Sequence, residues 1–399
     1  MSVSEPPFEE PQPEDPTVIN TGNGGTDGFV KCERCGSTDV GFSVTKALLF
    51  CKYCRHEWQS ENAVDAYQLN SPISELVGIH IGSGSAALIP GTDQVMTFKC
   101  SGCGAEVVID TQHALQSRCH WCRQTLSVQE QIPNGAVPDA VLPFALPKEA
   151  AVQRIKEFVN KRKFFALRKF KAEFNAENVI GVYLPYMIVD INAKMSLGGV
   201  GEVKLRSYRV GSGDDARTVY DADVYQISRQ FDLHIDDLTV ESSFDKGNIN
   251  NRTNTNNIIN AIMPFDTQNI VKFDPNYLAG FSSEKRDTNV EDLSDLAALQ
   301  ASDVGRSLAH HTLQRYDRGV RWEQERFNVV GERWISAYLP VWIYSYYHKK
   351  SSGQALLHYI AVNGRTGETM GSVPINTKRL LVASAIAQLI GTIAFVLVW

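Results

Sequence analysis

Apolar residues recur with two different periods along this chain of 399 residues. Residues 148–165 place apolar side chains on one face of a helix, namely Ala151, Ile155, Phe158 and Val159. This spacing predicts an amphipathic helix. Residues 179–197 are instead rich in β-branched and aromatic side chains, a composition that predicts a strand.

The same two patterns alternate through the rest of the chain. Residues 203–245 alternate between apolar and polar positions and predict further antiparallel strands, and an Asn-rich loop follows at 248–257. Apolar residues in helical register predict a helix at 291–316. Strand patterns resume at 327–350 and at 355–375, where Asn363–Gly364 and Gly367 supply the turn of a hairpin. The fold class predicted for residues 131–376 is therefore an α+β body in which strands dominate.

Two stretches of this body are similar to one another. The segment "GVYLPYMIVD" at 181–190 is echoed by "SAYLPVWIYS" at 336–345, and each has Tyr-Leu-Pro before an apolar strand. Proline at the start of a strand costs no ladder hydrogen bond. The echo is compatible with two related β-rich halves or with one mixed sheet, and the sequence does not choose between them.

The chain ends in an uncharged apolar run from Leu380 to Trp399, directly after Lys378 and Arg379. About 20 apolar residues are needed for a helix to cross a bilayer core. We therefore predict a single transmembrane helix at 379–399 rather than a buried core helix. The positive-inside rule places the basic flank, the bulk of the chain and the N-terminus in the cytoplasm. The lipid bilayer is therefore one expected partner.

Eight cysteines fall in two stretches of identical spacing, "KCERCGSTDVGFSVTKALLFCKYCR" and "KCSGCGAEVVIDTQHALQSRCHWCR". Each stretch has two Cys-x-x-Cys pairs separated by fifteen residues. Zinc prefers four thiolates in a tetrahedron, which two such knuckles can supply. The predicted ligands are Cys32, Cys35, Cys51 and Cys54 in one site and Cys100, Cys103, Cys119 and Cys122 in the other. Gly36 and Gly104, each after a second cysteine, allow the chain to turn back.

The alternatives to two structural zinc ions are disulfides, an iron–sulfur cluster and a thioredoxin-like redox pair. A long chain without a signal peptide favours thiolates over disulfides, and each pair has a matched partner, unlike a redox motif. Four protein ligands leave zinc no open position, so hydrolysis at the metal is not expected. His56 and His120, near the knuckles, are expected to be solvent-facing neighbours.

The predicted organisation follows from these elements. In order, it comprises a disordered acidic tail at 1–29, a zinc ribbon at 30–60, a linker at 61–96, a second zinc ribbon at 97–130, the body at 131–376 and the transmembrane helix at 379–399. The linker is expected to be an exposed loop, in which the run Ile79–His80–Ile81 is compatible with a short strand.

No catalytic residue is predicted. The sequence contains no P-loop, no Gly-x-Ser-x-Gly elbow and no His-Glu-x-x-His motif. Gly198, Gly199 and Gly201 have no βαβ context and predict a turn rather than a phosphate cradle. The pairs Asp236–Asp237 and His310–His311 are expected on the solvated surface.

The net charge of −6 excludes a basic field over the whole molecule. One local stretch, 148–171, has nine Lys or Arg against two Glu, with phenylalanines interleaved. It fits a solvated helix whose phenylalanines enter the core, a surface for anionic lipid, or a nucleic-acid site.

Several motifs together resemble a known family. They are "FKCSGCGAEVVID" with "CHWC", "VLPFALPKEAAVQRIKEF", "MPFD" (Met263–Asp266), "YLAGFSSEK" (Tyr277–Lys285), "YLPVWIYSY" (Tyr338–Tyr346) and "YIAVNGRTGETMGSVPI" (Tyr359–Ile375). From about Thr97 onward the chain resembles bacterial membrane proteins with a transcription-factor-IIB-type (TFIIB-type) zinc ribbon, sometimes labelled primosomal-helicase-like. The helicase label would imply an ATPase, and without a Walker motif we attribute it to the zinc ribbon alone.

The resemblance implies a membrane-anchored partner of phage-shock and flotillin-like membrane-stress proteins, located in a bacterial inner membrane. The expected function is accordingly that of a non-enzymatic adapter that recruits proteins to the membrane. The alternative is a membrane-tethered nucleic-acid-binding protein, which is less favoured by the acidic composition.

Overall fold

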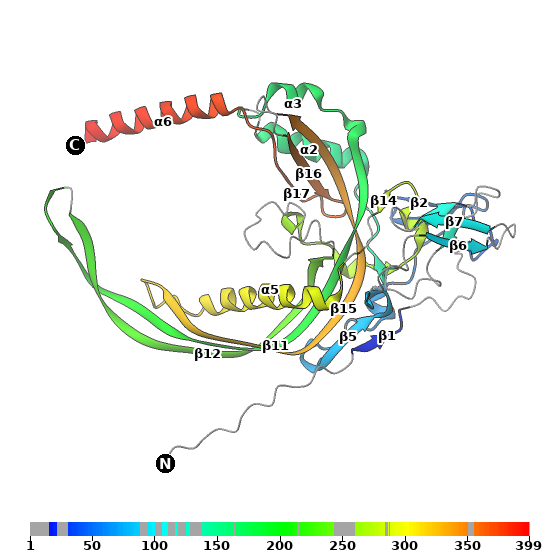
Figure 1. The fold of residues 1–399 in the computed structure, drawn as a ribbon, viewed down its shortest axis with the longest axis horizontal. Helices are drawn as coiled ribbons and strands as arrows, with labels where there is room; N and C mark the ends of the chain where they lie inside the picture. The colour runs from blue at the N-terminus through cyan, green and yellow to red at the C-terminus, as the bar shows by residue number, and fades with distance from the viewer. Residues whose placement is uncertain are drawn as a thin grey trace, which may run out of the picture.

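The computed structural model describes residues 16–21, 31–87, 95–99, 106–110, 116–118, 125–127, 137–162, 164–213, 216–242, 260–283, 286, 288–349 and 355–398. Figure 1 shows a long, strongly curved sheet, with a helix along its concave side and a second long helix extending away from the body. The chain is thus mixed α+β and rich in strands, which confirms the predicted class at that level.

Ten strands of the described residues form one sheet around a central antiparallel pair, β11 (Val179–Val210) and β15 (Val320–Lys349). The outer edge of β11 pairs with β12 (Arg217–Glu241) and β14 (Ser282–Ser283). The outer edge of β15 pairs in turn with β5, β10 and β16. The remaining bounds in this sheet are β1 (Thr17–Ile19), β5 (Gly78–Gly82), β10 (Ala140–Val141), β13 (Val271–Lys272), β16 (Ala355–Asn363) and β17 (Thr369–Gly371).

The two Tyr-Leu-Pro segments lie opposite one another in the central pair. Leu184 of β11 faces Leu339 of β15, so each Tyr faces the other segment's Pro. A short parallel strand flanks each segment at equivalent positions, β14 beside β11 and β10 beside β15. The order of short strand, helix, long strand and hairpin partner therefore occurs twice, first as β10, α2 (Lys148–Lys161), β11 and β12 and then as β14, α5 (Val290–His310), β15 and β16. Each short strand pairs with the long strand of the other run, because β10 pairs with β15 and β14 pairs with β11.

Two helices cover one face of this sheet. They are α2, which buries Ile155 and Phe158, and α5, which buries Leu293 and Ala297. At the start of α5, the Asp292 carboxylate accepts a hydrogen bond from the Asn289 N–H at 3.3 Å. Because β11 is covered on both faces, it is buried almost continuously from Val179 to Met195, without strand alternation.

The opposite face is covered by short elements. Here α1 (Ala63–Ala66) and the segment around Phe265 and Ile270 pack on alternate residues of the central strands. Other helical bounds are α3 (Arg168–Glu173), η1 (Ile73–Glu75), η2 (Ser83–Ser85), η3 (Ala176–Asn178), η5 (Asn260–Ile262), η6 (Thr267–Asn269) and η7 (Pro275–Leu278).

The described part of the predicted linker, 61–87, differs from an exposed connector. It contains α1, η1, β5 and η2, and β5 pairs in parallel with β15. The described part of the predicted acidic tail, 16–21, likewise contains β1, which pairs with β5. Strands of three to five residues are too short to show an alternation of apolar and polar positions in the sequence. Their position therefore depends on the edge strand with which they pair.

The turn predicted at Gly198–Gly201 is wrong, because these residues lie inside β11. The pairing with β15 slips between Gly198 and Gly199. A Cβ on Gly199 would lie 2.2 Å from the carbonyl oxygen of Arg321, whereas one on Gly198 would meet nothing nearer than 3.7 Å. Glycine is thus required at position 199 by close backbone approach rather than by a turn.

The variant Gly199→Ala is expected to lower the free energy of unfolding by about 1–3 kcal/mol, the usual effect of an overpacked site. Gly198→Ala is the matched control and should be neutral or slightly stabilising, because it removes backbone freedom without a clash. Urea unfolding of the full chain in detergent measures both. Equal unfolding midpoints for the two variants would contradict the argument.

The last helix, α6 (Thr377–Val398), is uncharged and mainly apolar from Leu380 onward. No residue from Thr377 to Phe395 is buried against the rest of the described chain, and this segment is long and apolar enough to cross a membrane. Figure 1 shows α6 leaving the body on the side away from β2, β6 and β7, the strands that lie next to the cysteine pairs in sequence.

Candidate metal centre

Four cysteines converge at one end of a small three-stranded sheet, β2 (Val40–Ser43), β3 (Leu48–Cys51) and β4 (Glu57–Trp58). The Sγ atoms of Cys32 and Cys54 are 3.5 Å apart, and those of Cys35 and Cys51 are 3.6 Å apart. All four sulfur atoms lie within 4.8 Å of one another, and none is in a disulfide. The sequence-predicted first ligand set is therefore brought together in space.

Two similar turns present these sulfur atoms. Gly36, after the first pair, has φ +72° and donates its N–H to Cys32 O at 2.7 Å. Arg55, after the second pair, has φ +63° and donates its N–H to Cys51 O at 3.0 Å. The sequence indicated the turn at Gly36. It gave no signal for the turn at Arg55, because a non-glycine residue adopts the left-handed conformation there.

The electrostatics of the group favour a bound cation. Burial acts to raise the pKa of the Cys51 thiol, but the backbone N–H groups of Cys54 and Tyr53 lower it to about 6. The Ser37 backbone N–H acts to lower the pKa of Cys35, but burial and the adjacent sulfurs raise it to about 12. Four neighbouring thiols cannot all ionise without a positive charge between them.

The residues present fit a structural metal ion. A tetrahedral zinc ion with Zn–S bonds of 2.3 Å requires sulfur atoms about 3.8 Å apart, close to the two measured separations. Cys32, Cys35, Cys51 and Cys54 could therefore hold a metal ion. His56 stacks instead on Trp58, with ring centroids 5.6 Å apart.

The second predicted ligand set, Cys100, Cys103, Cys119 and Cys122, lies outside the described residues, as do Gly104 and His120. The strands that flank these cysteines in sequence form two antiparallel pairs. They are β6 (Val95–Lys99) with β7 (Glu106–Asp110), and β8 (Gln116–Arg118) with β9 (Thr125–Ser127). The second zinc site stays a prediction.

The first cysteine module is packed firmly against the body. Val40 and Leu49 of its small sheet are buried in the same cluster as α2 and the central strands. The Phe42 ring contacts the Tyr277 ring edge-on at 5.2 Å, and the Tyr277 hydroxyl accepts a hydrogen bond from Ser60 N. The sequence contains no signal for the role of Tyr277, because Tyr277 lies more than two hundred positions from Phe42 and Ser60, the residues that it contacts.

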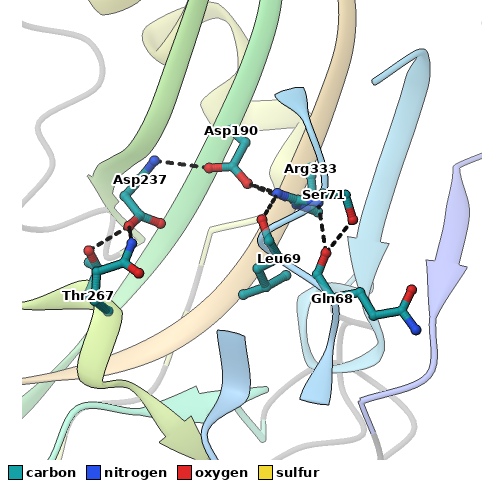
Figure 2. A network of polar contacts seen from close by, with 8 residues as sticks. Gln68, Leu69, Ser71, Asp190, Asp237, Thr267 and Arg333 are labelled. Atoms are coloured by element: carbon teal, nitrogen blue, oxygen red, sulfur yellow. Dashed lines mark hydrogen bonds and ion pairs between the residues drawn. The ribbon is translucent and has the colours of Figure 1, made fainter. Parts of the chain in front are cut away.

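A second polar cluster lies where β11, β12 and β15 meet (Figure 2). Arg333 donates to Asp190 Oδ2 from Nε at 2.8 Å and from Nη2 at 2.5 Å, and both side chains are buried. Arg333 also donates to the carbonyl oxygens of Gln68 and Leu69, which follow the C-terminal end of α1. The Asp237 N–H donates to Asp190 Oδ1 at 2.9 Å.

Asp190, Asp236 and Asp237 are close enough to hold a cation, but protein donors already contact two of them. Both Asp190 oxygens accept hydrogen bonds, and Asp237 accepts from Thr267 and Gln268. Burial raises the pKa of Asp190 to about 6, although the Asp237 N–H and Arg333 act in the opposite direction. The expectation that Asp237 is only a solvated surface residue is wrong. The cluster instead connects β11, β12 and β15 by hydrogen bonds and an ion pair.

The four phenylalanines of the basic stretch 148–171 have different environments. Phe158 and Phe170 are buried in the core, and Phe165 is half-buried. Phe164 is 64% exposed. Most of the stretch is therefore a solvated helix with its aromatic side in the core, and one ring remains outside.

Comparisons with known proteins are sparse. No protein-family model matches the chain, and no solved structure matches it. The chain is 23% identical over 247 residues to the uncharacterised protein YdjG of Bacillus subtilis strain 168. The match covers 62% of this chain and 67% of YdjG. Because YdjG is itself uncharacterised, the similarity assigns no activity or partner to this chain.

Proposed function

We propose that this protein is a membrane-anchored adapter whose zinc ribbons recruit protein partners to a bilayer surface. The observation that carries the proposal is the placement of two features on opposite sides of one body (Figure 1). One is the apolar helix α6, none of whose described residues is buried, and the other is the cysteine module packed against the central sheet. An adapter requires a folded body between an anchor and a docking head.

The metal in this proposal is structural. Four cysteines fill the tetrahedron of a zinc ion and leave no position for a substrate or an activated water. The cysteine module is also too small to form a core of its own, and zinc would supply the missing folding free energy. The exposed knuckle carries Tyr53, which is 81% exposed, a residue type enriched at protein interfaces.

The orientation follows from the charges beside the anchor. Lys378 and Arg379 stand at the start of α6, so the positive-inside rule places the body in the cytoplasm. We propose a single-pass protein of a bacterial inner membrane with its N-terminus on the cytoplasmic side. The family resemblance of the sequence suggests phage-shock and flotillin-like membrane-stress proteins as partners.

The test is recruitment of such a partner in cells that contain the full chain. Serine replacement of Cys100 and Cys103, alone and together with Cys32 and Cys35, is expected to abolish membrane recruitment of a fluorescently tagged phage-shock-like protein. The variants should still sediment with membranes, because α6 is unchanged. Recruitment that survives the loss of all four cysteines would overturn the adapter proposal.

A titration with nucleic acid distinguishes the adapter proposal from the alternative function, nucleic-acid binding at the membrane. The zinc-loaded chain in detergent is mixed with labelled single- and double-stranded DNA and RNA at low and physiological salt. The adapter proposal expects no salt-sensitive binding. Micromolar or tighter binding that weakens steeply with salt would instead indicate a membrane-tethered nucleic-acid-binding protein.

A further inference from the structure

The loop between α2 and α3 is fastened to the start of α6. The Leu167 N–H donates to Pro374 O at 2.9 Å, and the Asn376 N–H donates to Phe165 O at 2.7 Å. Arg379 Nη1 donates to the carbonyl oxygen of Phe164 at 3.3 Å. The loop and the first turn of α6 therefore form one corner of the protein, although some two hundred residues separate them in sequence.

An exposed aromatic ring stands at this corner. Phe164 is 64% exposed and contacts the Phe165 ring edge-on at 4.9 Å. With Val382, Ala383 and Ile386 of α6 it lines an open groove of about 570 Å³. The ring thus lies at the level where the apolar part of α6 begins.

Basic side chains line the groove or lie near this ring in sequence. Lys378 and Arg379 line the groove together with Phe164. Lys161, Arg168 and Lys169 lie within five residues of Phe164 in sequence, and all three are exposed. Arg162 is partly engaged, since its guanidinium lies 3.6 Å from the centre of the Phe158 ring. The nearby acid Glu173 lies 3.7 Å from Lys169 and accepts from the Tyr346 hydroxyl. The corner is therefore positively charged, although the net charge of the whole chain is −6.

We propose that this corner is a second membrane contact that selects anionic phospholipid headgroups. Phe164 enters the apolar edge of the bilayer beside α6, and Lys161, Arg168 and Lys169 bind the headgroup phosphates. A single spanning helix leaves the attached body free to swing, and a second contact fixes its tilt. The inference rests on the proposed membrane anchor, because α6 brings the corner to the bilayer.

Two observations favour lipid over nucleic acid as the occupant. Sequence-tolerant binding of single strands uses several aromatic rings on which successive bases stack. Here Phe158 and Phe170 are buried in the core and only the Phe164 ring is largely exposed. That ring also shares its groove with the apolar face of α6, which suits acyl chains rather than bases.

The experiment places the photoreactive residue p-benzoylphenylalanine at position 164 of the full chain. The protein is reconstituted in nanodiscs of phosphatidylcholine, with or without phosphatidylglycerol, and irradiated, and lipid adducts are measured by mass spectrometry. The matched control carries the same residue at position 77, because Val77 is 66% exposed and directly precedes β5, which Figure 1 shows on the opposite side of the body from α6. We expect lipid adducts at position 164 but not at 77, with a higher yield when phosphatidylglycerol is present.

The charge requirement is tested in the same chain. The variant K161Q/R168Q/K169Q should reduce the phosphatidylglycerol-dependent yield at least about fivefold, the effect of one basic residue near an anionic surface. The control K31Q/R34Q/K46Q removes three exposed basic residues of the first cysteine module, on the side of the body away from α6, and should leave the yield unchanged. No adduct at position 164, or a yield insensitive to both phosphatidylglycerol and the triple variant, would overturn the inference while the anchor stands.

Two further outcomes have distinct meanings. A chain that does not enter the nanodiscs at all contradicts the anchor, and with it this inference. Adducts at position 164 with a labelled single-stranded oligonucleotide, in place of lipid, would show that the corner is a nucleic-acid surface and would also overturn the inference.

Discussion

Replacing Cys32 and Cys35 by serine is expected to halve the zinc content of the protein and to unfold the first cysteine module. Structural zinc contributes about 10–16 kcal/mol of apparent binding free energy in small modules of this kind. The damage should extend into the body, because Val40 and Leu49 of the module are buried in the same cluster as Tyr277. Elemental analysis and hydrogen exchange around residues 273–281 measure the two effects.

The control for this experiment is His56→Ala, which removes a neighbouring imidazole that stacks on Trp58 and spares all four sulfur atoms. It should retain both zinc ions and normal exchange protection. The variant Cys100→Ser with Cys103→Ser should also lose one zinc ion, through the second predicted site. Two retained zinc ions in the first double variant would contradict the assignment of its site.

Replacing Arg333 by methionine is expected to lower the free energy of unfolding by about 3–5 kcal/mol, because it leaves the Asp190 carboxylate buried without its cation. Adding Asp190→Leu should recover much of that loss, since the buried charge is then absent. Denaturant unfolding of Arg333→Met, Asp190→Leu and the double variant gives the coupling free energy between the two side chains. The control Arg306→Met breaks a partly exposed ion pair with Glu325 and should cost less than about 1 kcal/mol.

The Asp190 pair also predicts a pH dependence. The pKa of Asp190 is about 6 in the folded protein and 3.8 in an ordinary aspartate. The folded state therefore binds this proton more tightly than the unfolded state. This contribution to stability is present in full below about pH 4 and is lost as the pH rises through 6. Asp190→Asn should flatten that part of the stability profile, and an unchanged profile would contradict the raised pKa.

Much of the fold could be predicted because the decisive segments have clear local patterns. Residues 148–165 and 291–316 have helical periods, and α2 and α5 lie within them or nearly so. The long strands are dense in β-branched and aromatic residues, as β11 and β15 show. The Cys-x-x-Cys pairs brought Cys32, Cys35, Cys51 and Cys54 together as expected, because each knuckle is local and a short hairpin joins them.

What could not be predicted depends on residues distant in sequence. The contact of Asp190 with Arg333 joins positions 143 apart, and neither side chain stands in a recognisable motif. The segment 61–87 was expected to be a linker with a short strand near residues 79–81. The pairing of that strand, β5, with the edge of β15 has no signal in the sequence. The slip in pairing at Gly199 similarly depends on the backbone of Arg321.

The exchange of the short strands fixes the order in which the newly made chain can complete its fold. Strand β10, at residues 140–141, waits for β13 and for β15, whose residues 320–349 emerge when most of the chain has been synthesised. The apolar β11 is exposed on one edge during that time. Pairings this distant form slowly and leave partly folded chains open to aggregation. The last central strand thus leaves the ribosome shortly before the apolar helix α6, so the body closes as the proposed anchor emerges.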